Sequence, residues 1–321
     1  MNADWVAASV RARSMAQRRL GADPCRTVAA QPTLAAGLAL LAETVYGVRL
    51  AAVQSDSTAS PSALTLAAVE HALRATTLWQ VRVLSGWLPV AGSRLARALA
   101  AEYEVDNILA LAARLHPGAP GTSAEPVYLA LGALATAWPR ARTAQTPDEL
   151  AQVLRASRWG EIGTGPGSLR DILTLSRLGR LAAESLPARP WTQSAAGLLV
   201  ARVRLVDQTE PSLRFRQLAR PLVGARWLQA TTMPELRDTL PHAARSTLDG
   251  IDDPRDLWRA EARHHESMES DALRLLRAAL PGPDVILGGV VILAVDAWRV
   301  RAALGAAAAG RGASEVLDAV A

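Results

Sequence analysis

The sequence predicts an all-α protein, and three observations support this fold class. Alanine, the strongest helix former, makes up roughly a fifth of the 321 residues. Strand-favouring aromatic residues are scarce, with 1 Phe and 3 Tyr. Long segments carry apolar residues at helical spacing, and no part of the sequence alternates strand and helix patterns. Because 50% of the residues are hydrophobic, the chain can bury a substantial core.

The apolar spacing predicts a series of helices in chain order. Each segment ends at a Pro, a Gly or a Ser/Thr-rich break. The predicted helices cover residues 4–20, 33–47, 63–115 with an interruption near 89–92, 127–138, segments that start at 147, 211 and 233, and a final helix pair after 283. The predicted loops are residues 55–62, 116–123, 160–167 and 186–190, of which 116–123 is the clearest linker.

Two helix starts carry local signals. In Thr146-Pro147-Asp148-Glu149, the Pro stands in the first turn and the acids lie near the positive end of the helix dipole. Met233-Pro234-Glu235-Leu236 opens another helix. We therefore expect one helix to begin in each of these segments.

A short segment recurs along the chain. Leu41-Ala-Glu-Thr-Val-Tyr-Gly47 is echoed by Leu154-Arg-Ala-Ser-Arg-Trp-Gly160, which matches a hydroxyl, an aromatic residue and a Gly at the same spacing. A fainter third copy opens at Pro234. Chance similarity is the alternative, because Leu and Ala are frequent in this chain. The echo predicts three helical repeats, over residues 1–119, 120–213 and 214–321.

The basic residues are 35 Arg and no Lys, and the formal net charge is +5. The absence of Lys excludes a P-loop lysine, a pyridoxal Schiff base and a lysine general base. Charge is spread evenly along the chain, so no basic arm is available to neutralise phosphates. An Arg-rich helical nucleic-acid-binding module is therefore an alternative interpretation that depends on the high isoelectric point alone.

Cys25 is the only cysteine, which excludes an intrachain disulfide and a thiolate zinc site and favours a reducing compartment. The first 20 residues lack the apolar core of a signal peptide. The longest apolar run, Val285–Val295, is shorter than the roughly 20 residues that span a bilayer. We expect a cytoplasmic chain without a membrane span.

Two motifs could hold a ligand. Gly163-Thr-Gly-Pro-Gly-Ser168 resembles a phosphate-binding loop, but no strand precedes it, so a turn with Ser168 as helix N-cap is favoured. Glu261, His265 and Glu269 lie four residues apart on one helical face and could form part of a metal site. No further ligand is evident, so we favour a solvated face and predict neither metal nor cofactor. His264 and Met268 stand beside this face, and the remaining histidines are isolated: His71, His116 and His242.

Three acids stand close together at Glu102, Glu104 and Asp106. Glu102 and Asp106 would lie one helical turn apart, where their mutual repulsion would raise a carboxyl pKa. A hydrolase with paired carboxylates needs two facing walls, which one helix does not supply. We therefore expect Glu102 or Glu104 to be hydrogen-bonded, or paired with an Arg, between packed helices.

Three segments in the first third of the chain resemble the C-type family of central-stalk proteins of archaeal and bacterial A/V-type ATPases (V-type ATP synthases), the counterpart of the d-type family of eukaryotic vacuolar ATPases. Ala8–Leu20 is similar to the opening helix of that family. A second segment is similar to its Leu/Thr/Tyr motif, through Leu41, Thr44, Tyr46 and Gly47. A third matches its pattern of two acids, an Asn and an aliphatic residue, through Glu102, Glu104, Asn107 and Ile108.

The resemblance is weaker in the later repeats. The position of the second acid is filled by Ala201 in the second repeat and by Asp296 in the third. The position of the Asn is filled by Arg204 and Arg299. The overall length and the three helical repeats also resemble the family.

The resemblance implies a funnel of three pseudo-repeated helical bundles around a central cavity. It also implies a non-catalytic central-stalk component, peripheral on the cytoplasmic face of the membrane. The implied partners are the central shaft and the membrane proteolipid ring, and the component links proton or sodium transport to ATP synthesis or hydrolysis. The motif residues would have packing roles. The alternatives are the nucleic-acid-binding module and a small-molecule enzyme built on the helix that carries His265.

Overall fold

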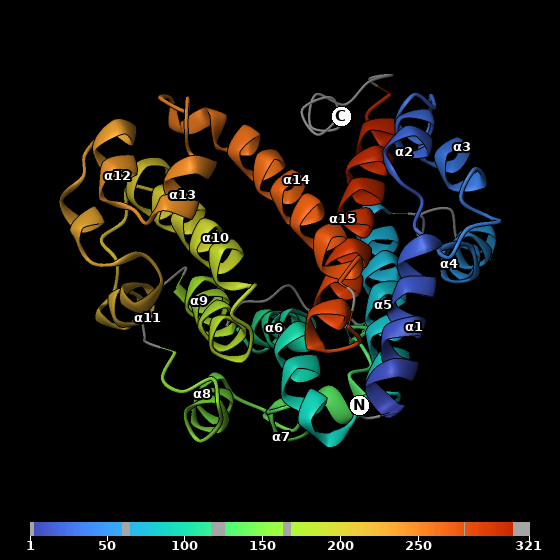
Figure 1. The fold of residues 1–321 in the computed structure, drawn as a ribbon, viewed down its shortest axis with the longest axis horizontal. Helices are drawn as coiled ribbons and strands as arrows, with labels where there is room; N and C mark the ends of the chain where they lie inside the picture. Colours follow the sequence, from blue (N-terminus) through green and yellow to red (C-terminus); the bar gives the residue numbers. More distant parts are fainter. Residues whose placement is uncertain (1–2, 60–64, 117–125, 163–167, 279, 311–321) are drawn as a thin grey trace. The chain divides into compact units, whose positions relative to one another are not determined.

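The computed structural model describes residues 3–59, 65–116, 126–162, 168–278 and 280–310. Every regular element in these ranges is a helix, which confirms the predicted all-α class (Figure 1). None of the helices described is long and apolar enough to cross a membrane. The predicted linker beyond His116 and the glycine-rich turn at 163–167 lie outside the described residues.

The chain divides into two compact units. The terminal unit comprises Met1–Ser93 and His265–Ala321, and the central unit comprises Arg94–His264. Helix α14 (Leu257–Leu276) contributes its first turns to the central unit and the rest to the terminal unit. The division into repeats at residues 119 and 213 stays a prediction.

Helix α15 is the centre of the terminal unit. The other helices of this unit are α1 (Ala3–Gln17), α2 (Ala22–Ala29), α3 (Leu34–Ala39), α4 (Gly47–Ala59), α5 (Leu66–Ser85) and the second part of α14. α15 (Pro283–Ala308) packs against α1, α2, α3 and α5 (Figure 1). Its close approach to α1 requires Gly289, since a Cβ there would lie 2.9 Å from the Cβ of Ala12.

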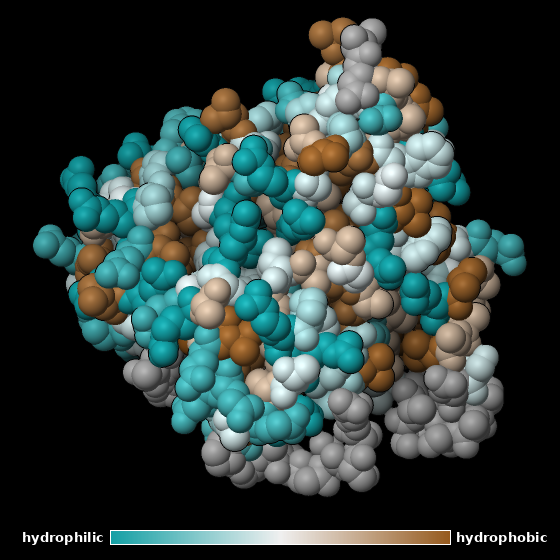
Figure 2. Space-filling model, turned by 90° about the horizontal axis from the view of Figure 1, so that it is seen from below, coloured by the Kyte–Doolittle hydropathy of each residue, from teal (hydrophilic) through white to brown (hydrophobic). Residues whose placement is uncertain are grey.

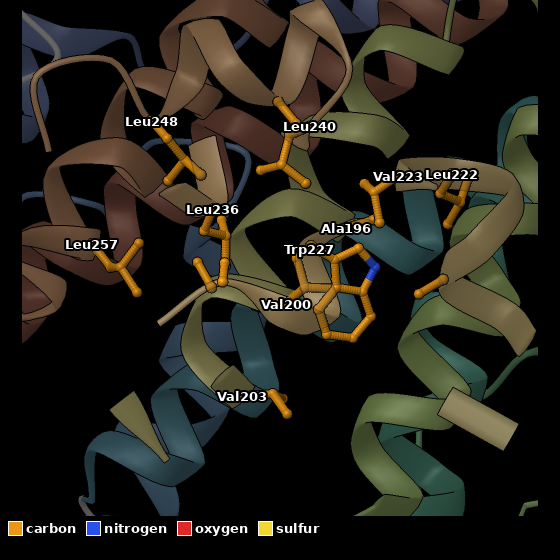
Figure 3. Close-up of a cluster of buried hydrophobic side chains, with 14 of the residues drawn as sticks. Ala196, Val200, Val203, Leu222, Val223, Trp227, Leu236, Leu240, Leu248 and Leu257 are labelled. Atoms are coloured by element: carbon orange, nitrogen blue, oxygen red, sulfur yellow. The ribbon is translucent and has the colours of Figure 1, made fainter. Parts of the chain in front are cut away.

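The central unit is built on a second hydrophobic core. Its helices are α6 (Ser93–Leu115), α7 (Trp138–Ala141), α8 (Pro147–Arg155), α9 (Ser168–Glu184), α10 (Arg189–Ala201), α11 (Leu213–Val223), α12 (Met233–Thr239), α13 (His242–Thr247) and the start of α14. Trp227 is fully buried, and its ring centroid lies 5.9 Å from that of Phe215. Side chains from α10, α11 and α12 surround it (Figure 3).

The short helices α3, α8 and α12 begin with the same cap. The hydroxyl oxygen of Thr33, Thr146 or Thr232 accepts the N–H of the residue three positions later, at 3.2, 3.2 and 3.4 Å. In α8 and α12 that residue is Glu149 or Glu235, whose carboxylate accepts an N–H just before the cap, at 2.7 and 2.9 Å. The helix starts predicted at Thr146 and Met233 are confirmed.

The predicted helix over residues 127–138 is wrong. Between residue 126 and α7, the chain is irregular apart from one 3-10 turn at Gly132–Leu134. The side chain of Asn107 binds both the N–H and the C=O of Leu129, which removes these groups from any helical ladder. Trp138 starts α7 instead, with Pro139 in the first turn.

Other predicted boundaries also need correction. Gly47 begins α4 and does not end a helix, because α3 ends at Ala39 and turns follow it. Ser55–Ala59 belongs to α4, so this part of the predicted loop is helical. Among the residues described near the C-terminus, one helix replaces the predicted pair, and it continues past Gly305 to Ala308.

Candidate functional site

Glu104 is the centre of a buried junction in the central unit. Its side chain lies on α6, and the residue is 1% exposed. Oε1 accepts the backbone N–H groups of Thr136, Ala137 and Trp138, at 2.7, 2.8 and 2.8 Å. Oε2 accepts the indole N–H of Trp159 at 3.1 Å and the hydroxyl of Thr136. These donors satisfy a carboxylate that burial would otherwise destabilise.

Asn107 extends this junction by one helical turn. Its Nδ2 donates to the carbonyl oxygen of Leu129 at 2.8 Å, and its Oδ1 accepts the N–H of Leu129 at 2.7 Å. Glu104 and Asn107 together fix the irregular segment from Leu129 to Trp138 against α6. We name Glu104, Asn107 and Trp159 the Glu104 junction.

Asp296 forms a second junction, in the terminal unit. The residue lies on α15 and is 1% exposed. Its carboxylate accepts the N–H groups of Leu20 and Gly21, at 2.9 and 2.8 Å, which fixes the link between α1 and α2. It also accepts the hydroxyl of Tyr46 at 2.7 Å. We name Asp296 and Tyr46 the Asp296 junction.

The two junctions have the same parts. Each has an acid on a long helix, backbone N–H groups at the start of a short helix, and the polar tip of one aromatic residue, Tyr46 or Trp159. The two similar segments, Leu41–Gly47 and Leu154–Gly160, therefore each provide the aromatic donor of one junction.

A hydroxyl two residues earlier orients each aromatic side chain. Thr44 Oγ1 donates to the carbonyl oxygen of Leu41 at 2.6 Å and accepts the N–H of Tyr46 at 3.3 Å. Ser157 makes the same two bonds, at 2.7 and 3.1 Å, to the residues at equivalent positions. The match in local hydrogen bonding adds a structural likeness to the likeness in sequence.

Gly47, the last residue of the motif, has a steric role. A Cβ at this position would lie 1.9 Å from the carbonyl oxygen of Ala42, which only a change of backbone could relieve. Gly160 is the equivalent residue in the second copy, and its φ of +70° favours glycine for a different reason. Both turns therefore require a residue without a side chain.

The prediction for the acidic cluster is partly confirmed. Glu104 is hydrogen-bonded between packed segments, as expected, but its direct donors are backbone, hydroxyl and indole groups and not an Arg. Arg180 lies nearby, with its guanidinium 4.7 Å from the ring centroid of Trp159. Glu102 is half-buried and supplies none of the bonds of the Glu104 junction.

The position equivalent to Glu104 in the predicted second repeat has no carboxylate. Ala201 is fully buried at the end of α10, and a π-helical turn, Arg202–Val206, follows it. Arg204 stands at the Asn position and donates to the carbonyl oxygen of Ala230 at 3.2 Å. Arg204 thus binds one backbone carbonyl, whereas Asn107, at the equivalent position, binds both the C=O and the N–H of Leu129.

Arg299 stands at the equivalent position in the terminal unit. It is 3% exposed and pairs with Glu269 on α14. Burial opposes the charge of Arg299, but Glu269 and Asp296 outweigh this effect and raise its pKa. Arg19 approaches the same carboxylate at 3.9 Å. This charged group connects α14 to α15 beside the Asp296 junction.

The predicted solvated face on α14 is wrong for two of its three residues. Glu269 is engaged by Arg299, and the ring of His265 stacks on Trp298 with centroids 4.1 Å apart. Glu261 is exposed. Within the described part of the chain, no group of three or more His, Cys, Asp or Glu side chains could hold a metal ion.

Several arginines serve as tertiary caps for backbone carbonyls. Arg13 donates to the carbonyl oxygens of Leu276, the last residue of α14, and of Ala278, at 2.9 and 2.7 Å. Arg263 donates to Thr247 and Asp249, at 3.0 and 2.6 Å. On the face in Figure 2, hydrophilic and hydrophobic residues are intermixed. Part of the arginine content is therefore explained by packing within the chain.

The sequence pattern did not reveal which backbone groups the acids hold. Thr136, Ala137 and Trp138 fall in a segment predicted to be helical, although Pro139 is a signal for a helix that starts at Trp138. Leu20 and Gly21 lie far in sequence from Asp296, and only the tertiary fold brings them together.

No protein-family model matches the chain, and no curated protein matches it.

Proposed function

We propose that this chain is a non-catalytic central-stalk component of a rotary A/V-type ATPase. It would connect the rotor shaft to the proteolipid ring on the cytoplasmic face of the membrane and so link proton or sodium transport to ATP synthesis or hydrolysis. The observation that carries this proposal is the recurrence of one buried junction at Glu104 and Asp296. These are the positions at which the sequence resembles the acid of the family motif.

The chemistry of the junctions suits a part that transmits torque. A coupling component must keep its segments from sliding when it is twisted. Each acid binds several N–H groups of a neighbouring segment, and a hydrogen bond to a charged group contributes roughly 1.5–3 kcal/mol. The junctions would thus stiffen the protein without any catalytic role.

The recurrence of these parts also supports the proposed threefold repeat. Among the described residues, α5–α6, α9–α10 and α14–α15 are three pairs of successive helices, and a Thr-capped short helix, α3, α8 or α12, stands earlier in the chain than each pair, with α4 or α13 between them in the first and third cases. The three bundles around a central cavity are part of the proposal.

Nucleic-acid binding is the weaker interpretation. Arginines that cap carbonyls, such as Arg13 and Arg263, or that pair with acids, such as Arg299, already have partners within the chain. Steep loss of affinity with salt would be required of a protein that binds phosphates. No contact among the described residues favours that function over the rotary one.

The direct test is reconstitution with the two implied partners. The purified chain should bind both the shaft and the proteolipid ring, and ATP-driven ion transport by the assembled motor should require it. The matched control is a motor assembled without the chain, in which ATP hydrolysis by the catalytic head should continue without transport. A chain that binds neither shaft nor ring would refute the proposal.

A further inference from the structure

The end of α10 departs twice from regular helical geometry. Arg202–Val206 forms a π-helical turn, closed by a hydrogen bond from the N–H of Asp207 to the carbonyl oxygen of Arg202 at 2.9 Å. Gln208 follows with a φ of +50°, a left-handed conformation that residues other than Gly rarely adopt. Among the described residues it is the one residue other than Gly with a positive φ. Both π-helical turns and strained backbone are frequent at sites that switch between conformations.

This turn lies at the edge of the core of the central unit. Val203 is 3% exposed, within that core, and its carbonyl oxygen accepts the N–H of Thr209 at 3.1 Å. Residues 206–210 are all exposed. A segment whose backbone hydrogen bonds lie beside solvent, with few buried side chains, opens at low cost in free energy. The turn can therefore open locally while the core stays closed.

A largely buried carboxylate fixes the turn to a neighbouring helix. Asp171 lies in the first turn of α9, its side chain is 13% exposed, and it pairs with the guanidinium of Arg202. The carboxylate of Asp207 lies 3.8 Å from Nε of the same guanidinium, too far for a direct hydrogen bond. The pair between Asp171 and Arg202 therefore connects the first residue of the π-helical turn to α9.

The same carboxylate takes up a proton more readily than an exposed one. Burial raises the pKa of Asp171 above its ordinary value of 3.8, although the charge and the hydrogen bond of Arg202 lower it. Two other charged groups face Asp171: Asp207, after the turn, raises this pKa, and Arg170, on α9, lowers it. Since the pKa is higher in the folded state, protonation of Asp171 as the pH falls favours the folded state over the unfolded one. Proton uptake at this carboxyl thus removes a charge beside Arg202 without itself unfolding the central unit.

We propose that Asp171 and Arg202 form a pH-sensitive latch on the π-helical turn. When Asp171 is charged, the ion pair holds Arg202 and the turn is closed. When Asp171 is protonated, Arg202 loses the attraction of the carboxylate, and the hydrogen bonds from the N–H groups of Asp207 and Thr209 open. The latch goes beyond the proposed function and does not depend on it.

Amide hydrogen exchange of the full-length chain tests the latch. Protection factors, which correct each exchange rate for the intrinsic effect of pH, are measured from about pH 7 down to about pH 4. At Asp207 and Thr209 of the wild type they should fall about tenfold, with a midpoint above pH 3.8. In Asp171→Asn, whose amide resembles the protonated carboxyl, and in Arg202→Gln, protection should already be low at pH 7 and should not change further.

The matched control is Glu210→Gln. Glu210 is an exposed carboxylate just after the same turn, but it approaches Arg204 and Arg216, at 3.7 and 3.9 Å, and not Arg202. This variant should titrate like the wild type. The reference amide is Gly224, which bonds to the carbonyl oxygen of Arg220 at the end of α11, at 2.9 Å, and whose protection should not change with pH.

Every other outcome overturns the latch. Protection at Asp207 and Thr209 that does not depend on pH in the wild type would do so, as would an unchanged titration in Asp171→Asn or the loss of the titration in Glu210→Gln. An equal fall at Gly224 would mean a general loosening of the central unit and would also overturn it. None of these outcomes concerns binding to the shaft or the ring, so the proposed function is tested separately.

Discussion

At the scale of single residues, the direct hydrogen-bond donors that stabilise the two buried carboxylates carry no charge. Glu104 accepts backbone, hydroxyl and indole groups, and Asp296 accepts two backbone groups and a phenol. Such an arrangement depends on every donor being present, because a buried polar group without its partner is costly. Small changes at the donors should therefore be measurable.

Replacement of Tyr46 by Phe removes one donor from the Asp296 junction and leaves the ring in place. We expect the Tyr46→Phe variant to unfold with a free energy about 1–2 kcal/mol lower than the wild type, measured by urea denaturation. Tyr128→Phe is the matched control, because the Tyr128 hydroxyl is buried and lacks a hydrogen-bond partner among the described residues. Its stability should be unchanged or slightly higher. Equal losses in the two variants would contradict the assigned role of Tyr46.

Because the Cys25 thiol is buried, we expect the free energy of unfolding to depend on pH in the alkaline range. Burial, and then the neighbouring Asp296, raise the pKa of Cys25 from 9.0 to about 12. The unfolded thiol therefore ionises at lower pH than the folded one, so its contribution to stability is complete below pH 9.0 and is lost as the pH rises towards 12.

The measurement is the free energy of unfolding at several pH values, for the wild type and for Cys25→Ala. Between the two pKa values, the wild type should lose up to about 1.4 kcal/mol per pH unit more than the variant. Other ionising groups are common to both proteins and cancel in the difference. Parallel pH profiles would show that the thiol does not contribute.

At the scale of elements, two glycines in helices should respond to the same substitution in opposite ways. A Cβ at Gly47 would lie 1.9 Å from the carbonyl oxygen of Ala42, whereas a Cβ at Gly305 would meet nothing within 4 Å. We expect Gly47→Ala to lower the free energy of unfolding by more than about 2 kcal/mol. Gly305→Ala should raise it by about 0.5–1 kcal/mol, because Ala favours the helix. Thermal melting of both variants tests the pair, and equal melting temperatures would contradict it.

Sequence reasoning succeeded for elements whose signals are local. The helix starts at Thr146 and Met233 depend on a hydroxyl cap and a nearby Glu, which the sequence displays directly. It failed for residues 127–138, where apolar spacing predicted a helix. There Asn107 holds Leu129 in an irregular conformation, and this contact between segments 22 residues apart has no local signature.

At the scale of the whole molecule, each compact unit contains one carboxylate junction. The resemblance to a known motif singled out Glu104, Asn107 and Asp296, and the structure gives each of them a buried hydrogen-bonding or charged environment. The backbone partners of these residues could not be predicted, because any segment can supply an N–H group. Only the packing of helices distant in sequence selects Leu20 or Thr136 as the donor.

Hydrogen exchange of the intact chain can show that each acid holds its own segment. In Glu104→Gln, the amides of Thr136, Ala137 and Trp138 should exchange about tenfold faster or more than in the wild type. In Asp296→Asn, the same change should appear at Leu20 and Gly21. Each variant is the control for the other. Faster exchange throughout the chain in either variant would mean general destabilisation and would contradict a local role.

The position of α15 has a consequence for synthesis of the protein. The N-terminal helices share a hydrophobic cluster with Val300, Ala303 and Leu304, and the α1–α2 link is bonded to Asp296. All of these partners are synthesised after the whole central unit. Residues 1–93 must therefore wait, with their apolar surfaces uncovered, while the central unit can fold first. Nascent chains that stall before α15 emerges should accordingly be the ones that recruit chaperones.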